Sequence, residues 1–125
     1  MHEPVDTRFA RQYRLVKPAE FKHVFQRSGK AGDKNLLVLA RRNTLGYARL
    51  GLAVSIKSVT NAVQRNRVKR VARETFRHQK TQLGGMDFIV ISRAGLADKT
   101  NRELRVALEK HWLSHANAKN PDSSD

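Results

Sequence analysis

Residues 50–80 decide the fold: LGLAVSIKSVTNAVQRNRVKRVARETFRHQK. The stretch opens with an alternation of side chains that is typical of a β-strand. One face of this strand carries Ala48, Leu50, Leu52, Val54 and Ile56, and the other carries Arg49, Gly51, Ala53 and Ser55. The small residues of the second face leave room for something to lie on the sheet. A helix of the same chain and a ligand explain that room equally well.

The second half of the stretch has the period of an amphipathic helix. Its apolar stripe consists of Val68, Val71, Ala72 and Phe76, with Leu83 as a further candidate. Ser58, Thr60 and Asn61 are all suitable N-caps, and Gly84-Gly85 ends the helix. The other side of the helix carries six cations: Arg65, Lys69, Arg70, Arg73, Arg77 and Lys80. Like charges at this spacing destabilise an isolated helix, so the pattern predicts phosphates close by.

Further elements are predicted on both sides of this stretch. Buried strands are expected at 36–40 and 87–92, and a short helix at about 18–28, where Phe21, Val24 and Phe25 form one stripe. Gly32-Asp33 is expected in a loop. A last helix is expected from Asp98 or Thr100, with Leu104, Leu108, His111, Trp112 and His115 at helical spacing. The order α-β-β-α-β-α, with three or four strands, predicts an α+β sandwich, with Phe88 and Trp112 in its core.

The length of 125 residues suits a single domain, which we place at residues 17–115. Residues 1–16 are predicted to form an extended basic arm, with Arg8, Arg11, Arg14 and Lys17 at three-residue spacing and Phe9 and Tyr13 available for stacking. Residues 116–125 are polar and are predicted to be a disordered tail. The protein is expected to be a monomer.

The charge of the chain indicates a polyanionic partner. The sequence has 25 Lys+Arg and 11 Asp+Glu, a formal net charge of +14, and residues 57–80 hold eight basic residues against one acid, Glu74. A solvated charged face is the alternative, although such faces usually mix both signs. The chain has no cysteine and no apolar run of membrane-spanning length, so we expect a cytoplasmic protein that is not bound to a membrane. Charge alone does not distinguish a ribosomal or DNA-binding protein from other RNA-binding proteins.

A histidine nuclease is a further alternative. His111 and His115 stand at i, i+4, a spacing that could ligate a metal. No HExxH motif or acidic cluster accompanies them, and a surface pair at a helix C-terminus explains them better. We therefore predict no catalytic residue and no tightly bound cofactor in this chain.

The segment Ala62–Arg70, AVQRNRVKR, resembles the A-V-x-R-N-R-x-K-R motif of the protein subunit of bacterial ribonuclease P. The similarity continues through Arg73-Glu74 and Phe76-Arg77. Upstream it includes Glu20-Phe21, Val24-Phe25 and the strand Leu50–Ser55, and downstream Asp87–Val90. In all it extends from about Arg14 to Trp112. One departure is visible, because this chain has Ser58 and Thr60 where family members often have lysine and glycine.

The resemblance implies a fold and a role. The family fold is an α+β sandwich of order α-β-β-β-α-β-α, with a left-handed β-α-β crossover. Its members assist a catalytic RNA that uses Mg²⁺ to remove the 5′ leader from precursor tRNA. Binding of the catalytic RNA, one protein to one RNA, is thereby assigned to Arg65, Asn66, Arg67, Lys69, Arg70 and Arg73. Helix capping is an equal alternative for Asn66.

The leader of precursor tRNA is expected in a cleft between the sheet and the first helix. Its predicted contacts combine aromatic faces for bases with cations for phosphates: Tyr13, Arg14, Phe21, Phe25 and Arg49. The helical spacing of Phe21 and Phe25 is equally typical of core residues. The resemblance favours the cleft for at least one of them.

Overall fold

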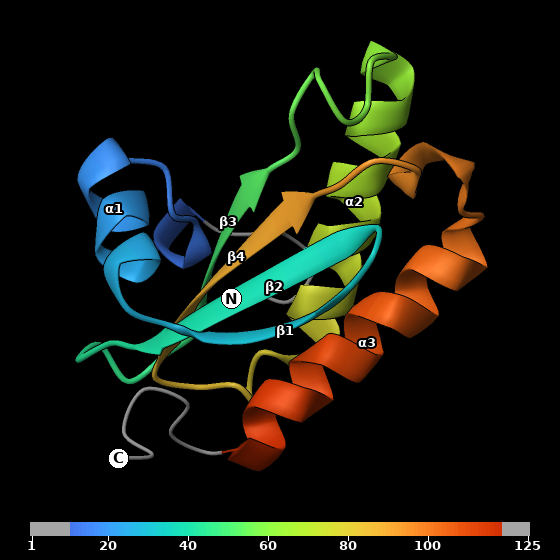
Figure 1. Cartoon of the computed structure of the whole chain (residues 1–125). Coiled ribbons are helices and arrows are strands. Elements are labelled where there is room, and N and C mark those ends of the chain that lie inside the picture. The colour runs from blue at the N-terminus through green and yellow to red at the C-terminus, as the bar shows by residue number, and fades with distance from the viewer. Residues whose placement is uncertain (1–10, 119–125) are drawn as a thin grey trace, which may run out of the picture.

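A four-stranded mixed sheet forms the centre of the molecule in the computed structural model, which describes residues 11–118 (Figure 1). The strands are β1 (Gly29–Asp33), β2 (Leu36–Arg42), β3 (Arg49–Ala53) and β4 (Met86–Ser92). Their order in the sheet is β1-β2-β4-β3. β2 pairs antiparallel with β1 and β4, whereas β3 and β4 are parallel. A parallel pair needs a crossover, and here a helix supplies it.

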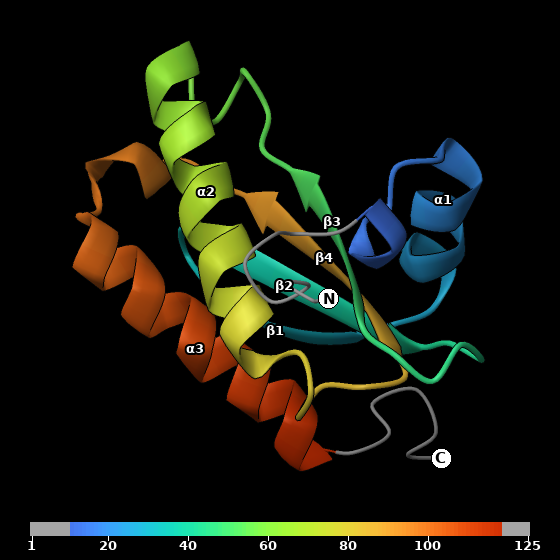
Figure 2. The ribbon, with the colours of Figure 1, turned by 180° about the vertical axis from the view of Figure 1, so that it is seen from behind.

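Helices cover both faces of the sheet. The α-helices are α1 (Pro18–Gln26), α2 (Ala62–Gln79) and α3 (Asn101–Ala118), and short 3₁₀ turns are η2 (Arg11–Tyr13) and η3 (Leu96–Asp98). α2 and α3 lie side by side on one face, and α1 lies on the other (Figures 1 and 2). The predicted α+β sandwich and the order α-β-β-β-α-β-α are confirmed. No helix within residues 11–118 is long and apolar enough to cross a bilayer.

The crossover β3-α2-β4 is left-handed, as the resemblance implied. In Figure 2 the sheet is seen from the side of α2. With the strands turned to point upward, β4 lies to the left of β3. Right-handed crossovers occur in about 98% of such units. Because a left-handed crossover is rare, it distinguishes this fold from other α+β sandwiches better than the arrangement of its layers does.

The main core lies between the sheet and the helices α2 and α3. Phe76, Phe88 and Trp112 are fully buried there, with ring centroids 5.4 to 6.1 Å apart in edge-to-face arrangements. The indole Nε1–H of Trp112 donates to Thr75 Oγ1 at 3.1 Å, so its polar atom is satisfied. The predicted core positions of Phe88 and Trp112 are confirmed, as is the apolar stripe of α2.

A smaller core lies on the opposite face of the sheet, beneath α1. It contains Leu15, Val24, Leu39 and Ile89, with Phe21 packed against them. Gly51 of β3 makes this packing possible, because a Cβ there would come within 2.7 Å of the Phe21 ring. The room on the small-residue face of β3 is thus filled at Gly51 by a helix of the same chain.

Three predicted boundaries were wrong. Gly32-Asp33 belongs to β1, not to a loop: this edge strand has no strand-like composition and forms because it pairs along β2. Residues 11–16 are not an extended arm, since η2 precedes a bridge between Arg14 and Leu50, and Leu15 is buried. The helix α3 continues to Ala118, beyond the predicted limit of 115, because Ala116 packs on the core. Residues 1–10, which include Phe9 and Arg8, and residues 119–125 lie outside the described part.

Candidate nucleic-acid interface

The helix α2 begins at a well-defined cap. The side-chain Oδ1 of Asn61 accepts hydrogen bonds from the backbone N–H groups of Val63 at 2.8 Å and Gln64 at 3.2 Å. These are two of the donors that a helix start leaves without a partner. Of the three candidate caps, Asn61 is the one used. Asn66 is exposed in the second turn and does not cap the helix, so the capping alternative for Asn66 was wrong.

The first two predicted arginines fix the helix to its surroundings. Arg65 Nη1 donates to the backbone oxygens of Val59 at 2.9 Å and Thr60 at 3.0 Å, which holds the loop in front of the helix. Arg67 links α2 to η3 and to the first residue of α3, because its Nη2 donates to Ala97 O at 3.1 Å and its Nη1 donates to Asn101 Oδ1 at 2.8 Å. Both side chains are therefore held in place, and Arg65 Nε and Nη2 have no acceptor among the described residues.

The remaining cations of the motif face two directions. Arg70 is exposed, next to Asn66, on the outer side of α2. Lys69 and Arg73 are half-buried and line a pocket of about 280 Å³. We call it the cationic pocket, and its lining is Arg14, Leu15, Val16, Phe21, Leu50, Leu52, Lys69 and Arg73.

The electrostatics of the cationic pocket favour an anion. Burial lowers the pKa of Arg73, and the nearby charge of Arg14 lowers it further. A guanidinium stays protonated despite such a shift, so the lowered pKa reflects first the cost of burying the Arg73 charge and second its repulsion by Arg14. A phosphate in the pocket would relieve that repulsion and accept hydrogen bonds from both arginines. The pocket joins Lys69 and Arg73, predicted for the catalytic RNA, to Arg14 and Phe21, predicted for the leader.

The two predicted aromatic contacts of α1 differ in environment. Phe21 is half-buried, lines the cationic pocket and packs over Gly51, so it serves both core and pocket. Phe25 is 51% exposed, and its ring centroid lies 6.3 Å from that of Phe21. An exposed ring next to a basic pocket provides a surface on which a base can stack.

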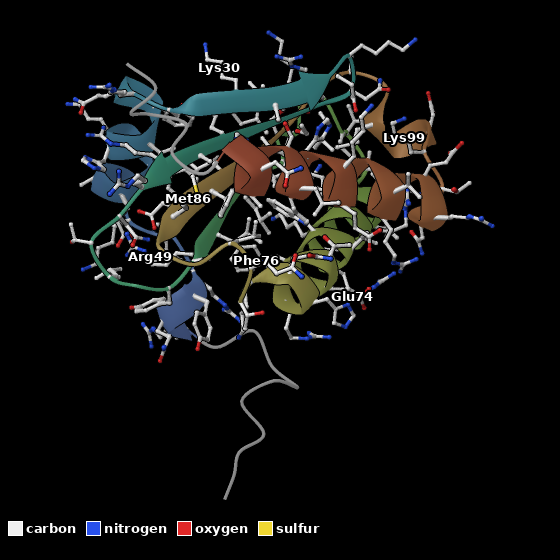
Figure 3. All side chains as sticks on the ribbon, turned by 90° about the horizontal axis from the view of Figure 1, so that it is seen from below. Lys30, Arg49, Glu74, Phe76, Met86 and Lys99 are labelled. Carbon is white, nitrogen blue, oxygen red and sulfur yellow. The ribbon has the colours of Figure 1, made fainter. Side chains whose placement is uncertain are left out.

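Arg49 has a structural role that the sequence did not show. Its Nε and Nη2 donate to the two carboxylate oxygens of buried Asp87, each at 2.8 Å, and its Nη1 donates to Glu20 at 3.0 Å. These bonds raise the pKa of Arg49, chiefly through Asp87. Figure 3 shows Arg49 at the end of the sheet near Met86. The side chain joins β3, β4 and α1, and its donors are used inside the protein.

Tyr13 lies in a different pocket from Arg14 and Phe21. Its ring stands edge-on to Tyr47, with centroids 5.5 Å apart, and Lys80 Nζ lies 3.8 Å from its centroid. The sequence offered no signal for this arrangement, because the three residues come from separate parts of the chain. Tyr13 belongs to η2, Tyr47 precedes β3 and Lys80 follows α2.

The histidine pair is buried, so its predicted surface position was wrong. His111 Nε2 lies 3.1 Å from Asp33 Oδ2, and His115 Nε2 lies 2.9 Å from Val38 O. Both side chains point from α3 to the β1–β2 hairpin, since they share the face that buries Trp112. Within residues 11–118 no three His, Asp or Glu side chains are grouped as metal ligands. The pair fastens α3 to the sheet.

The fold and this surface define a small basic α+β protein whose helix α2 and adjoining pocket present arginine and lysine side chains. The family model described as Ribonuclease P matches residues 9–116. The ribonuclease P protein component of Cronobacter sakazakii is 48% identical over 107 residues, which cover 86% of this chain and 90% of that protein. The corresponding protein of Salmonella arizonae is 47% identical with the same coverage.

Solved structures agree with the sequence comparison. The ribonuclease P protein of Staphylococcus aureus superposes with a TM-score of 0.77 at 33% identity, covering 86% of this chain and 98% of that one. That of Thermotoga maritima gives a TM-score of 0.68 at 31% identity, covering 78% and 92%. The chain belongs to the ribonuclease P protein family.

Proposed function

We propose that this chain binds the RNA subunit of ribonuclease P through α2 and holds the 5′ leader of precursor tRNA at the cationic pocket. Membership of the family makes the chain a protein subunit of this endoribonuclease, in tRNA 5′ maturation. The observation that carries the proposal is the position of Lys69 and Arg73. They extend the basic surface of α2 into a pocket that Arg14 and Phe21 also line.

Two RNA surfaces follow from this geometry. The exposed side of α2 and its first turn, with Arg65, Asn66, Arg67 and Arg70, faces the catalytic RNA. The cationic pocket takes the leader, with phosphate at Arg73 and Arg14 and bases toward Phe21 and Phe25. Arg49 is left out of the leader site because the carboxylates of Asp87 and Glu20 neutralise its guanidinium, whereas the acceptors of Arg67 are uncharged.

The chemistry of cleavage belongs to the RNA in this proposal. Mg²⁺ would be held by the holoenzyme RNA, and the protein would reduce repulsion between two polyanions and so lower the Mg²⁺ requirement. One protein would bind one RNA, in the bacterial cytoplasm. The buried histidines support this division, because neither of them faces the basic surface.

The decisive experiment is precursor-tRNA cleavage at low Mg²⁺ by a bacterial ribonuclease P RNA, with and without the protein. Cleavage at the mature 5′ end only when both are present is the expected result. Cleavage by the protein alone would contradict the proposal, as would an RNA whose activity the protein does not change.

The assignment of surfaces is tested with matched variants. Arg70→Ala should weaken binding to the catalytic RNA and reduce the slope of log affinity against log salt by about 1, from roughly −4 for about five neutralised phosphates. Arg102→Ala removes an equally exposed arginine from α3 and should change neither quantity. Equal effects of the two substitutions would show that net charge, not α2, determines binding.

A further inference from the structure

A second pocket lies between the end of α2 and the turn before β3. It has a volume of about 280 Å³, and we call it the tyrosine pocket. Its lining is Tyr13, Gly46, Tyr47, Ala48, Lys80, Thr81 and Gly84. The backbones of its two loops come close together, because a Cβ on Gly84 would lie 3.6 Å from Gly46 O. The small residues leave space in front of the two aromatic rings.

The lysine of this pocket has no acceptor within residues 11–118. Among these described residues Lys80 Nζ is buried and makes no hydrogen bond, and its contact in the pocket is with the face of the Tyr13 ring at 3.8 Å. A buried ammonium without an acceptor is unfavourable, and a cation–π contact offsets only part of the desolvation. An anionic ligand would supply the missing acceptor. The pocket thus combines an electrostatic requirement for an anion with an aromatic pair.

The tyrosine pocket continues the cationic pocket. Tyr13 lines the one and its neighbour Arg14 lines the other. On α2 and at its C-cap the cations Lys69, Arg73 and Lys80 are four and seven residues apart, and Lys80 keeps helical dihedral angles, so they lie on one side of the helix. Arg73 and Lys80 are about 10 Å apart along the helix axis, a distance that a short flexible strand can span.

We propose that the tyrosine pocket binds one unpaired nucleotide of the precursor leader, next to the part of the leader held in the cationic pocket. The base stacks on the ring of Tyr47, which stands perpendicular to that of Tyr13, and a phosphate accepts hydrogen bonds from Lys80. This inference rests on the proposed function. It adds a separate nucleotide subsite, whose aromatic groups come from η2 and from the turn before β3 and not from α1.

The test compares two precursor tRNAs in the reconstituted holoenzyme. One has a leader of about 3 nucleotides and the other has a leader of about 15. At roughly one nucleotide per stacking position, the short leader cannot fill both pockets and the long leader can. Tyr47→Ala should weaken binding of the long-leader precursor about tenfold, which corresponds to the loss of one stacked base. The short-leader precursor should bind unchanged. Tyr47→Phe keeps the ring and should behave as the wild type.

The charge is tested in the same assay. Lys80→Met keeps the apolar stem and should also weaken the long-leader complex selectively, whereas Lys110→Met removes an exposed lysine of α3 and should have no effect. A long leader that keeps its phosphates but lacks its bases shows whether the tyrosine pocket recognises a nucleotide or a phosphate alone. If Tyr47→Ala weakens the base-free leader as much as the normal one, the pocket recognises phosphate alone and the inference is wrong.

The outcomes distinguish failure of the proposed function from failure of the tyrosine pocket alone. A wild-type holoenzyme with no preference for the long leader would overturn the proposed function itself. A wild type with that preference, retained in both Tyr47→Ala and Lys80→Met, would overturn only the tyrosine pocket. Circular dichroism checks the fold of each variant. If Tyr47→Ala is unfolded, Lys80→Met alone decides the question.

Discussion

Replacement of Arg49 by alanine should destabilise the protein rather than weaken its contact with RNA. The guanidinium binds Asp87 through two parallel hydrogen bonds of 2.8 Å, and the Asp87 side chain is only 4% exposed. Without Arg49 the side-chain donor left to this carboxylate within residues 11–118 is the amide of Asn43, whose Nδ2 lies 2.8 Å from Asp87 Oδ1. Removal of one partner of a buried ion pair costs about 3 to 5 kcal/mol.

The lower end of that range applies here. The Arg49 side chain is 17% exposed and Glu20 is 24% exposed, so water reaches part of the network. We expect a loss of about 3 kcal/mol in the free energy of unfolding, or roughly 10 °C in melting temperature for a domain of this size. Urea unfolding followed by circular dichroism and by the fluorescence of buried Trp112 measures the change.

A second substitution isolates the cause. Arg49→Ala combined with Asp87→Asn no longer buries an unpaired charge and should recover much of the lost stability. If the free energy of unfolding of Arg49→Ala differs from that of the wild type by less than about 0.5 kcal/mol, which is typical of surface positions, the reasoning is refuted. A simultaneous loss of precursor affinity in that stable variant would return Arg49 to the leader site.

Three further predictions concern other parts of the structure. Gly51→Ala would place a methyl group within 2.7 Å of the Phe21 ring. It should therefore lower the free energy of unfolding in urea by about 1 to 3 kcal/mol and weaken binding of the long-leader precursor. Unchanged values would show that Phe21 can move aside. Asn61→Ala removes the cap of α2 and should cost about 1 kcal/mol, whereas Asn61→Asp should retain most of it; equal melting of both would contradict the capping role. Burial lowers the pKa of His115 below its ordinary value of 6.5, so the stability it contributes is fully present above pH 6.5 and is lost as the pH falls below that value. His115→Gln should flatten the stability profile between about pH 7 and 5, and a profile as steep as that of the wild type would exclude His115 as its source.

The sequence predicted those features that depend on local pattern. The apolar stripe of Val68, Val71, Ala72 and Phe76 determines which side of α2 is buried, and by exclusion it also determines the basic side. The strand β4 was equally easy to predict from the sequence, because it is an uninterrupted β-branched run. The handedness of the crossover came only from the resemblance, since nothing in the period of a sequence distinguishes the two hands.

The sequence could not predict features that depend on distant partners. Arg49 looks like a leader contact until Asp87, 38 residues later, is placed beside it. β1 has the composition of a loop and becomes a strand because β2 offers it a free edge. His111 and His115 look like a surface pair until the β1–β2 hairpin covers them. In each case the deciding partner comes from another element of the sheet.

Two arginines of α2 show how a protein of such high charge can hold part of its basic surface rigid. Arg65 and Arg67 each donate to backbone oxygens outside the helix, so their orientation is set within the protein itself. In the proposed complex, binding of RNA would then order fewer long side chains, and less conformational entropy would be lost. The same contacts explain why alanine at both positions would weaken RNA binding in two ways. It would remove charge, and it would also release the loop before α2 and the segment before α3 that hold the helix in place.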